Sequence, residues 1–294
     1  VVSPSRADWD YTEARALEHL LRRERPEFLI NAAGYTGKPN VDACESDRAA
    51  CLNGNAVLPG SIAMVCEALG IPWGHVSSGC IFSGRRADGA GFTEEDVPNF
   101  AFRTNNCSFY SGTKALGEEV LGYREVATPE GAKWQHSGSP SGYIWRLRIP
   151  FDEVDSPRNY LTKLLRYERL LEAENSISHL GEFVAACFAC FEQQVAYGIY
   201  NVTNPGAVTT RQVVGWMREE SARRQASGMD DPFAREFKFF ENLEDFMQKA
   251  AITPRSNCVL DTAKLTAAGI YLRPVEEAVR TALREWQAEE VCHA

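Results

Sequence analysis

Tyr110 and Lys114 stand four residues apart in the run Ser108-Phe-Tyr-Ser-Gly-Thr-Lys114. In a helix, this spacing places both side chains on the same face. A lysine ammonium beside a tyrosine lowers the pKa of the phenol and prepares it to pass a proton to a carbonyl oxygen. The pair therefore indicates carbonyl reduction. Because the same spacing also occurs on ordinary solvated helices, the pair needs support from other parts of the chain.

Two predicted strand ends supply that support. Ser78 ends one strand and offers a hydroxyl to the same carbonyl, and Cys80 follows it with a thiol. The preceding strand ends in Asn31-Ala32-Ala33-Gly34, whose small side chains let a cofactor approach the backbone. Ordinary turn formation is the alternative explanation of both segments.

Helical and extended patterns alternate along the chain and predict a parallel α/β sheet. The predicted strands are 27–31, 73–77, 142–148 and 198–202. The predicted helices are 10–25, 40–69 with a break near Pro59-Gly60, 110–121, 158–171, 179–195, 209–224 and 274–290. Residues 83–107 read as a long loop, and residues 128–141 as a polar surface insertion.

Composition restricts the function and the location. The 294 residues carry a net charge of −9, which argues against a nucleic-acid partner. No apolar run approaches the roughly 20 residues of a membrane span. Nine cysteines, an odd number without disulfide spacing, indicate a reducing cytoplasm. Cys187-Phe-Ala-Cys190 lies in an apolar run and predicts buried helix packing, so we expect no metal site.

Taken together, these motifs resemble the extended short-chain dehydrogenase/reductase superfamily, whose Ser/Thr, Tyr and Lys triad would fall on Ser78, Tyr110 and Lys114. The chain is more specifically similar to the nucleotide-rhamnose synthases of plants, which are 3,5-epimerase/4-reductases related to dTDP-4-dehydrorhamnose reductase. Seven segments carry this resemblance: 31–34, 38–46, 79–82, 92–100, 157–163, 200–206 and 254–257.

The resemblance implies a Rossmann-like, doubly wound parallel sheet in residues 1–150, and a smaller substrate lobe in residues 151–294 with some segments returning to the sheet. It assigns epimerisation to Cys80 and Lys163. A thiolate is a suitable base for the acidic protons beside a keto group, with a second group returning a proton from the other face. Without the resemblance, Cys80 reads as a buried small residue and Lys163 as a solvated lysine.

The resemblance also implies NADPH or NADH as cofactor, held by Asn31 to Gly34, Tyr110 and Lys114. The family's GxxGxxG turn, which holds the cofactor pyrophosphate, is absent from this sequence. We interpret the chain as lacking the first βα unit through truncation; loss of nicotinamide binding is the alternative. Arg6 would then follow the second strand and meet a 2′-phosphate, which favours NADPH.

Arg255 is expected to clamp a sugar-nucleotide pyrophosphate, and Asn159 to hold the sugar or nucleotide; surface or capping roles are the alternatives. The expected reaction inverts C3 and C5 of a UDP- or dTDP-linked 4-keto-6-deoxyhexose and reduces C4, giving an L-rhamnose-type sugar. The rivals are a reductase-only enzyme and a non-catalytic binding or regulatory subunit. The expected partner is the nucleotide sugar alone, without nucleic acid or membrane, and a homodimer is a possible assembly.

Overall fold

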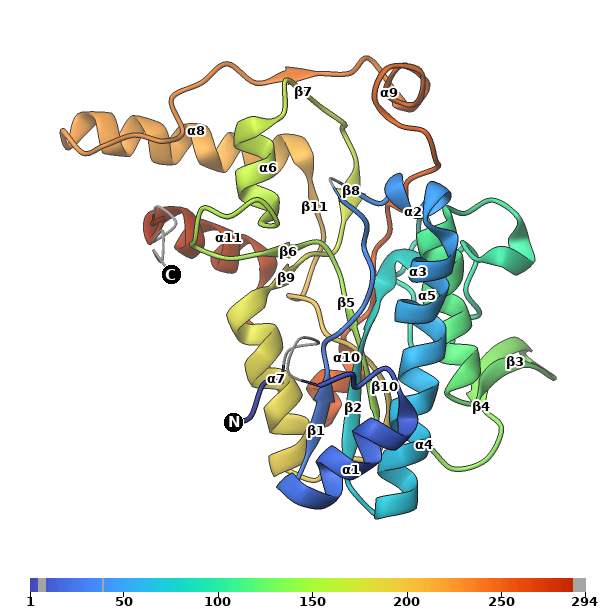
Figure 1. The fold of residues 1–294 in the computed structure, drawn as a ribbon. Helices are drawn as coiled ribbons and strands as arrows, with labels where there is room; N and C mark the ends of the chain where they lie inside the picture. The colour runs from blue at the N-terminus through green and yellow to red at the C-terminus, as the bar shows by residue number, and fades with distance from the viewer. Residues whose placement is uncertain (5–8, 39, 288–294) are drawn as a thin grey trace.

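A parallel sheet of four strands forms the centre of the protein, in a computed structural model that describes residues 1–4, 9–38 and 40–287 (Figure 1). Its order is β1-β2-β5-β10, comprising Leu29–Asn31, Trp73–Ser78, Tyr143–Leu147 and Gly198–Asn201. Asn31 pairs with His75, and Ser78 pairs with Leu147, so neighbouring strands end at the same edge. The four predicted strands and their parallel arrangement are confirmed.

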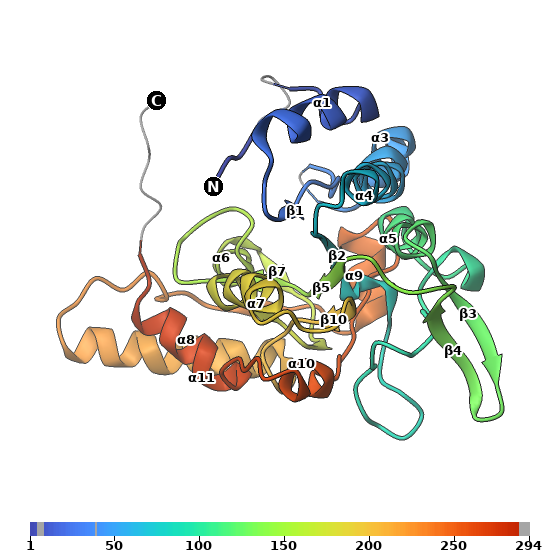
Figure 2. The same cartoon turned by 90° about the horizontal axis from the view of Figure 1, so that it is seen from below.

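Helices cover both faces of this sheet (Figure 2). Helices α1 (Ala14–Glu24), α4 (Leu58–Leu69) and α5 (Phe109–Val120) lie on one face, where leucines of α1 and α4 pack against strand residues such as Ile144. Helices α7 (Leu180–Glu192) and α10 (Ala263–Ala267) lie on the other face. Both sulfur atoms of the Cys187/Cys190 pair are buried in that second interface, which confirms the prediction of helix packing.

The helical run before β2 is interrupted at Asp47 and is continuous over Arg48–Leu69, so the predicted break near Pro59-Gly60 is wrong. Helices α2 (Ala43–Ser46) and α3 (Arg48–Leu52) lead into a π-helical turn, Asn53–Val57, and then into α4. The Leu58 N–H reaches five residues back to the Asn53 carbonyl. Pro59 therefore falls at the start of α4, where a proline is tolerated. Within the described chain, Arg48–Leu69 is long and apolar enough to span a membrane, contrary to the expectation that no apolar run approaches that length, but half of its most apolar window is buried inside the protein.

The C-terminal lobe surrounds a separate apolar core. Helices α6 (Tyr160–Arg166), α8 (Thr210–Ala226) and α11 (Val275–Arg284) enclose it, and α9 (Leu243–Ala250) lies near its edge (Figure 1). Its short strands pair as β6 with β9, β8 with β11, and β7 with β12, comprising Pro150–Phe151, Ser178–His179, Glu174–Asn175, Val208–Thr209, Arg169–Leu170 and Lys238–Phe239. The chain returns from this lobe to the sheet through α7, β10 and α10.

The polar segment over residues 128–141, which was expected to be a surface insertion, belongs to a β-hairpin that follows α5. Strands β3 (Tyr123–Thr128) and β4 (Gly131–His136) pair antiparallel, with Gly131 at a φ of 123° beside the turn. Trp134 anchors the hairpin, because its indole is buried and its Nε1 donates to Glu118 Oε2 at 3.0 Å. One buried aromatic residue was the sequence signal for this packing.

A buried ion pair fastens α5 to the sheet. Glu118 on α5 accepts two hydrogen bonds from Arg146 on β5, at 2.9 and 2.8 Å, and both side chains are fully buried. The Ser77 hydroxyl on β2 donates to the same carboxylate at 3.0 Å. The carboxylate and the guanidinium thus neutralise each other. A buried ion pair is tolerated without a large loss of stability only when its charges are compensated in this way.

We predict that Glu118→Gln lowers the free energy of unfolding by about 3–5 kcal/mol, because Arg146 is left buried without a counter-charge. Urea unfolding followed by circular dichroism measures the loss. Glu119→Gln is the matched control, since Glu119 makes an exposed pair with Arg103 at 3.1 Å and should contribute at most about 1 kcal/mol. Similar losses for both variants would contradict the role assigned to the buried pair.

Candidate active site

The segment after β1 is held by a buried histidine. Asn31 Nδ2 hydrogen-bonds to His75 Nδ1 at 3.0 Å, and Asn31 Oδ1 accepts from the Ala33 N–H at 3.0 Å. Burial, together with the charge of Lys114, holds the pKa of His75 well below its usual value. His75 is therefore neutral at physiological pH, and its unprotonated Nδ1 can accept from Asn31.

The Asn31–Gly34 turn also lies against α5. A side chain built on Gly34 would come within 3.3 Å of Lys114 Nζ and 3.2 Å of Asn55 Oδ1. Asn55, in the π-helical turn, accepts from the Tyr35 N–H at 2.9 Å and donates to the Tyr35 carbonyl at 2.8 Å. Asn55 was not predicted as a site residue, although a polar residue within an apolar helical run was a signal.

Four of the predicted catalytic side chains lie in one cluster at the carboxyl end of β2. Ser78 Oγ accepts from the Cys80 N–H at 3.2 Å and caps the 3₁₀ turn Gly79–Ile81. The Ser78 hydroxyl also hydrogen-bonds to Tyr110, whose helix begins at the Ser108 cap. Lys114 Nζ donates to the Val76 carbonyl at 3.4 Å.

Burial controls the electrostatics of this cluster. It raises the pKa of Tyr110, with a further upward contribution from Cys80, while the Ser78 hydrogen bond acts in the opposite direction. Burial also raises the pKa of Cys80 and lowers the pKa of Lys114. The expected lowering of the Tyr110 pKa by Lys114 is therefore wrong for this structure, because loss of solvation outweighs the nearby ammonium.

The remaining predicted residues lie in or near the C-terminal lobe. Lys163 is on α6, and burial followed by the charge of Arg158 lowers its pKa. Asn159 caps α6, accepting from the Leu161 N–H at 2.9 Å and donating to Asp152 and Val154. Arg6 lies outside the described residues.

Arg255 binds a carboxylate from the other end of the chain. Its two Nη atoms donate to the Asp42 oxygens at 2.6 and 2.6 Å, and this guanidinium lowers the pKa of Asp42. The contact joins residues 213 positions apart. Within the described ranges, no group of His, Cys, Asp and Glu side chains could hold a metal ion.

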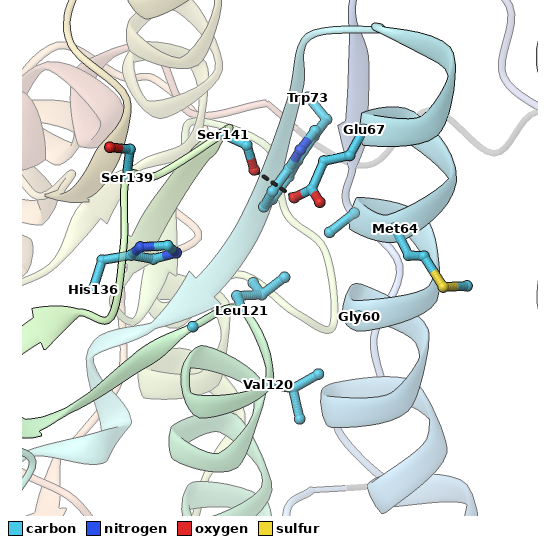
Figure 3. Close-up of a pocket in the computed structure, with 11 residues that line it drawn as sticks. Gly60, Met64, Glu67, Trp73, Val120, Leu121, His136, Ser139 and Ser141 are labelled. Carbon is cyan, nitrogen blue, oxygen red and sulfur yellow. Dashed lines mark hydrogen bonds between the residues drawn. The ribbon is translucent and has the colours of Figure 1, made fainter.

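Two cavities lie outside this cluster. Figure 3 shows one of about 340 Å³ between α4, the end of α5 and the segment after β4, where Ser141 donates to Glu67 at 2.5 Å. The other, of about 430 Å³, lies beside the β7–β8 connection and is lined by Gly84, Arg85, Leu171, Glu172, Ala173, Glu174, Leu243 and Asn257. Of the predicted site residues that the structure describes, none lines either cavity.

Comparison with known proteins identifies related sequences. Residues 1–127 match the profile of the RmlD substrate binding domain. The chain is 34% identical over 261 residues to the bifunctional dTDP-4-dehydrorhamnose 3,5-epimerase/dTDP-4-dehydrorhamnose reductase of Arabidopsis thaliana, covering 87% of this chain and 75% of that protein. It spans 34% of a trifunctional UDP-glucose 4,6-dehydratase/UDP-4-keto-6-deoxy-D-glucose 3,5-epimerase/UDP-4-keto-L-rhamnose-reductase of the same plant, at 31% identity over 87% of this chain.

Solved structures share the fold. The L780 UDP-rhamnose synthase of Acanthamoeba polyphaga mimivirus matches with a TM-score of 0.78 and 23% identity, covering 97% of this chain and 90% of that chain. The dTDP-4-dehydrorhamnose reductase of Bacillus anthracis, solved in complex with NADP, matches with a TM-score of 0.68 and 18% identity, covering 96% and 88%. The predicted Rossmann-like α/β class is thus confirmed.

The buried His75 predicts a specific dependence of stability on pH. Its folded-state pKa is depressed by burial, so the unfolded chain binds a proton below about pH 6.5 that the folded protein does not. The contribution of His75 to stability is complete above that pH and is lost as pH falls, by at most about 1.4 kcal/mol for each pH unit. Unfolding free energies measured between pH 5 and 8 test this slope.

His75→Gln should flatten the slope, because glutamine keeps an acceptor for Asn31 without titrating. His19→Gln is the control, since His19 is exposed on α1. An unchanged slope in the His75 variant would overturn the prediction.

Proposed function

Since this chain belongs to the family of the dTDP-4-dehydrorhamnose 3,5-epimerase/reductases, we propose that it is an NAD(P)H-dependent 3,5-epimerase/4-reductase. The substrate is a UDP- or dTDP-linked 4-keto-6-deoxyhexose, and the product is a nucleotide-linked L-rhamnose-type sugar. One observation carries the proposal: Ser78, Cys80, Tyr110 and Lys114 converge at the end of β2. A proton donor for O4 and a base for the adjacent carbons thus share one buried site.

Epimerisation is assigned to Cys80 and Lys163. A carbon beside a carbonyl is acidic, because its anion is delocalised onto the carbonyl oxygen. The Cys80 thiolate takes this proton, and Lys163 returns one from the opposite face, first at one carbon and then at the other. The lowered pKa of Lys163, caused by burial and Arg158, makes its ammonium group a stronger acid and therefore a better proton donor.

Reduction is assigned to Tyr110, with Ser78 and Lys114 in support. Tyr110 gives its proton to O4 while the Ser78 hydroxyl hydrogen-bonds to the same oxygen. When bound, a nicotinamide cofactor would provide the hydride for C4. As the phenolate forms, the nearby Lys114 ammonium stabilises it, so the favourable interaction arises when the charge develops.

The cofactor fits the turn after β1. Asn31, Ala32, Ala33 and Gly34 form this turn, and a Cβ at Gly34 would lie 3.3 Å from Lys114 Nζ, so the glycine lets the turn approach Lys114 closely. Related reductases support this assignment, since the Bacillus anthracis protein was solved with NADP. Arg6 is proposed to favour NADPH through a 2′-phosphate.

The nucleotide sugar is assigned to the C-terminal lobe, mainly within residues 151–294. Arg255 is the proposed clamp for the pyrophosphate, with Asp42 holding its guanidinium in a fixed orientation. Asn159 caps the helix that carries Lys163, so we propose that it acts on the sugar chiefly by fixing α6. The eight described cysteines are all free thiols, which supports a cytoplasmic location.

Two variants should separate the halves of the reaction. We predict that Tyr110→Phe slows C4 reduction by about 10²–10⁴-fold but retains deuterium uptake at C3 and C5, because proton removal does not need the phenol. Cys80→Ala should lose deuterium uptake by a similar factor and still reduce a substrate that is already inverted. The measurements are mass spectrometry of the sugar in D₂O and oxidation of NADPH.

Cys107→Ala is the matched control, because Cys107 is a half-buried thiol whose pKa is raised by burial and in part by the nearby Cys80, and which has no assigned role. Normal inversion by Cys80→Ala would remove Cys80 as the base, whereas an unmodified protein that takes up no deuterium at C3 and C5 would be a reductase-only enzyme. Absence of NADPH and NADH binding in a fluorescence titration would favour a non-catalytic subunit.

A further inference from the structure

Arg148 is a buried arginine that forms no ion pair with any residue that the structure describes. Three arginines are buried in the described part of the chain: Arg146, Arg148 and Arg224. Arg146 pairs with Glu118 at 2.8 Å, and Arg224 pairs with Glu220 at 2.8 Å. Arg148 is 6% exposed and has no ion pair with any described residue, and its Nε has no hydrogen-bond partner. A buried charge is costly unless an opposite charge or ligand compensates it.

The direct contacts of Arg148 are neutral. Its Nη2 donates to Asn175 Oδ1 and to the Ser256 carbonyl, both at 2.5 Å. These bonds orient the guanidinium but do not neutralise it. The side chain of Arg148 lies beside the 3₁₀ turn of the site, because its Cδ is 3.5 Å from the position of a Cβ built on Gly79. Gly79 immediately precedes Cys80.

The positive charge of Arg148 acts to lower the pKa of three acidic groups: Cys80, Cys258 and Tyr160. Cys258 donates its thiol hydrogen to the Gly79 carbonyl at 3.2 Å, which fixes it in the neutral form. Tyr160 is a weaker acid than a thiol in its ordinary state, and burial raises its pKa to about 12. Cys80 is therefore the group best suited to carry the compensating negative charge.

We propose that Arg148 is a positioning residue that stabilises the anionic form of Cys80 against the effect of burial, a role that rests on the proposed function of Cys80 as the base. When Cys80 removes the proton, the negative charge moves from its sulfur atom to the carbonyl oxygen of the substrate. The C–H bond breaks, its electron pair passes to the carbonyl oxygen as an enolate, and the proton forms an S–H bond on Cys80. Lys163 protonates the carbon from the other face, and Cys80 returns its proton to water.

Other groups also face Cys80 and contribute to its titration. Hydrogen bonds from Ser78 and Ser111 and the charge of Lys114 favour the thiolate, as does Arg148, whereas burial opposes it. Tyr110 and Cys107 lie within electrostatic range from α5 and the segment before it. Of the two cations, only Arg148 comes from the sheet side, so its removal can be tested without altering the Tyr110 and Lys114 pair.

The test is a titration of the Cys80 thiolate by its ultraviolet absorbance, taken as the difference between each protein and its Cys80→Ser counterpart. Arg148→Met should raise the midpoint by about 1–3 pH units, as expected for loss of an adjacent opposite charge. Arg148→Lys keeps the charge and should restore much of the shift. An unchanged midpoint in Arg148→Met would overturn the proposal.

A second pair of variants leaves the arginine in place and serves if Arg148→Met fails to fold. Asn175→Asp gives Arg148 a carboxylate partner and should raise the Cys80 midpoint, because the new anion competes for the guanidinium. Asn175→Ala removes the same amide without adding charge and should leave the midpoint near that of the unmodified protein. Equal midpoints in the two Asn175 variants would contradict the proposal.

The pH profile of deuterium uptake at C3 and C5 links the inference to the reaction. In Arg148→Met it should move to higher pH by the same shift, while reduction of an already inverted substrate keeps its rate. If the unmodified protein takes up no deuterium, the proposed epimerase function fails. The thiolate titration still decides whether Arg148 is the counter-charge of Cys80.

Discussion

The buried pair of Glu118 and Arg146 is the interaction on which the arrangement of the site depends. Glu118 lies one helical turn after Lys114, so fixing its carboxylate against β5 also fixes the face of α5 that carries Tyr110 and Lys114, the proposed catalytic pair. Ser77 on β2 and Trp134 on β4 bind the same carboxylate. One compensated charge thus holds a helix, two strands of the sheet and the hairpin in register, because an uncompensated charge in the same place would be strongly destabilising.

Arg146, in β5, and Arg148, directly after it, are both buried but have different partners. Arg146 and Arg148 are two residues apart, a spacing that places both side chains on the same side of an extended chain. Arg146 meets a carboxylate and stabilises the fold. Among the described residues, Arg148 donates to the neutral oxygen atoms of Asn175 and Ser256, so its charge is free for the role that we propose beside Cys80.

The sequence was sufficient for features that depend on local pattern. Alternating apolar segments predicted all four sheet strands, and the spacing of Tyr110 and Lys114 placed them correctly on one helix. Features that depend on distant partners were missed. Nothing near Arg255 indicates that Asp42 binds it, and nothing near Arg148 indicates that no carboxylate is available to it. The hairpin was missed because its polar strands have one buried anchor, Trp134, rather than a continuous apolar face.

Burial imposes a common constraint on the groups at the end of β2. It favours the neutral form of every one, raising the pKa values of Tyr110 and Cys80 and lowering that of Lys114. Catalysis requires charge at the same positions, and in a poorly solvated site an anion is stable only beside a cation. Lys114 can serve the phenolate, but a single ammonium cannot be the main counter-charge of the thiolate as well. Arg148 resolves this requirement, since it supplies a second cation from the opposite side of the cluster.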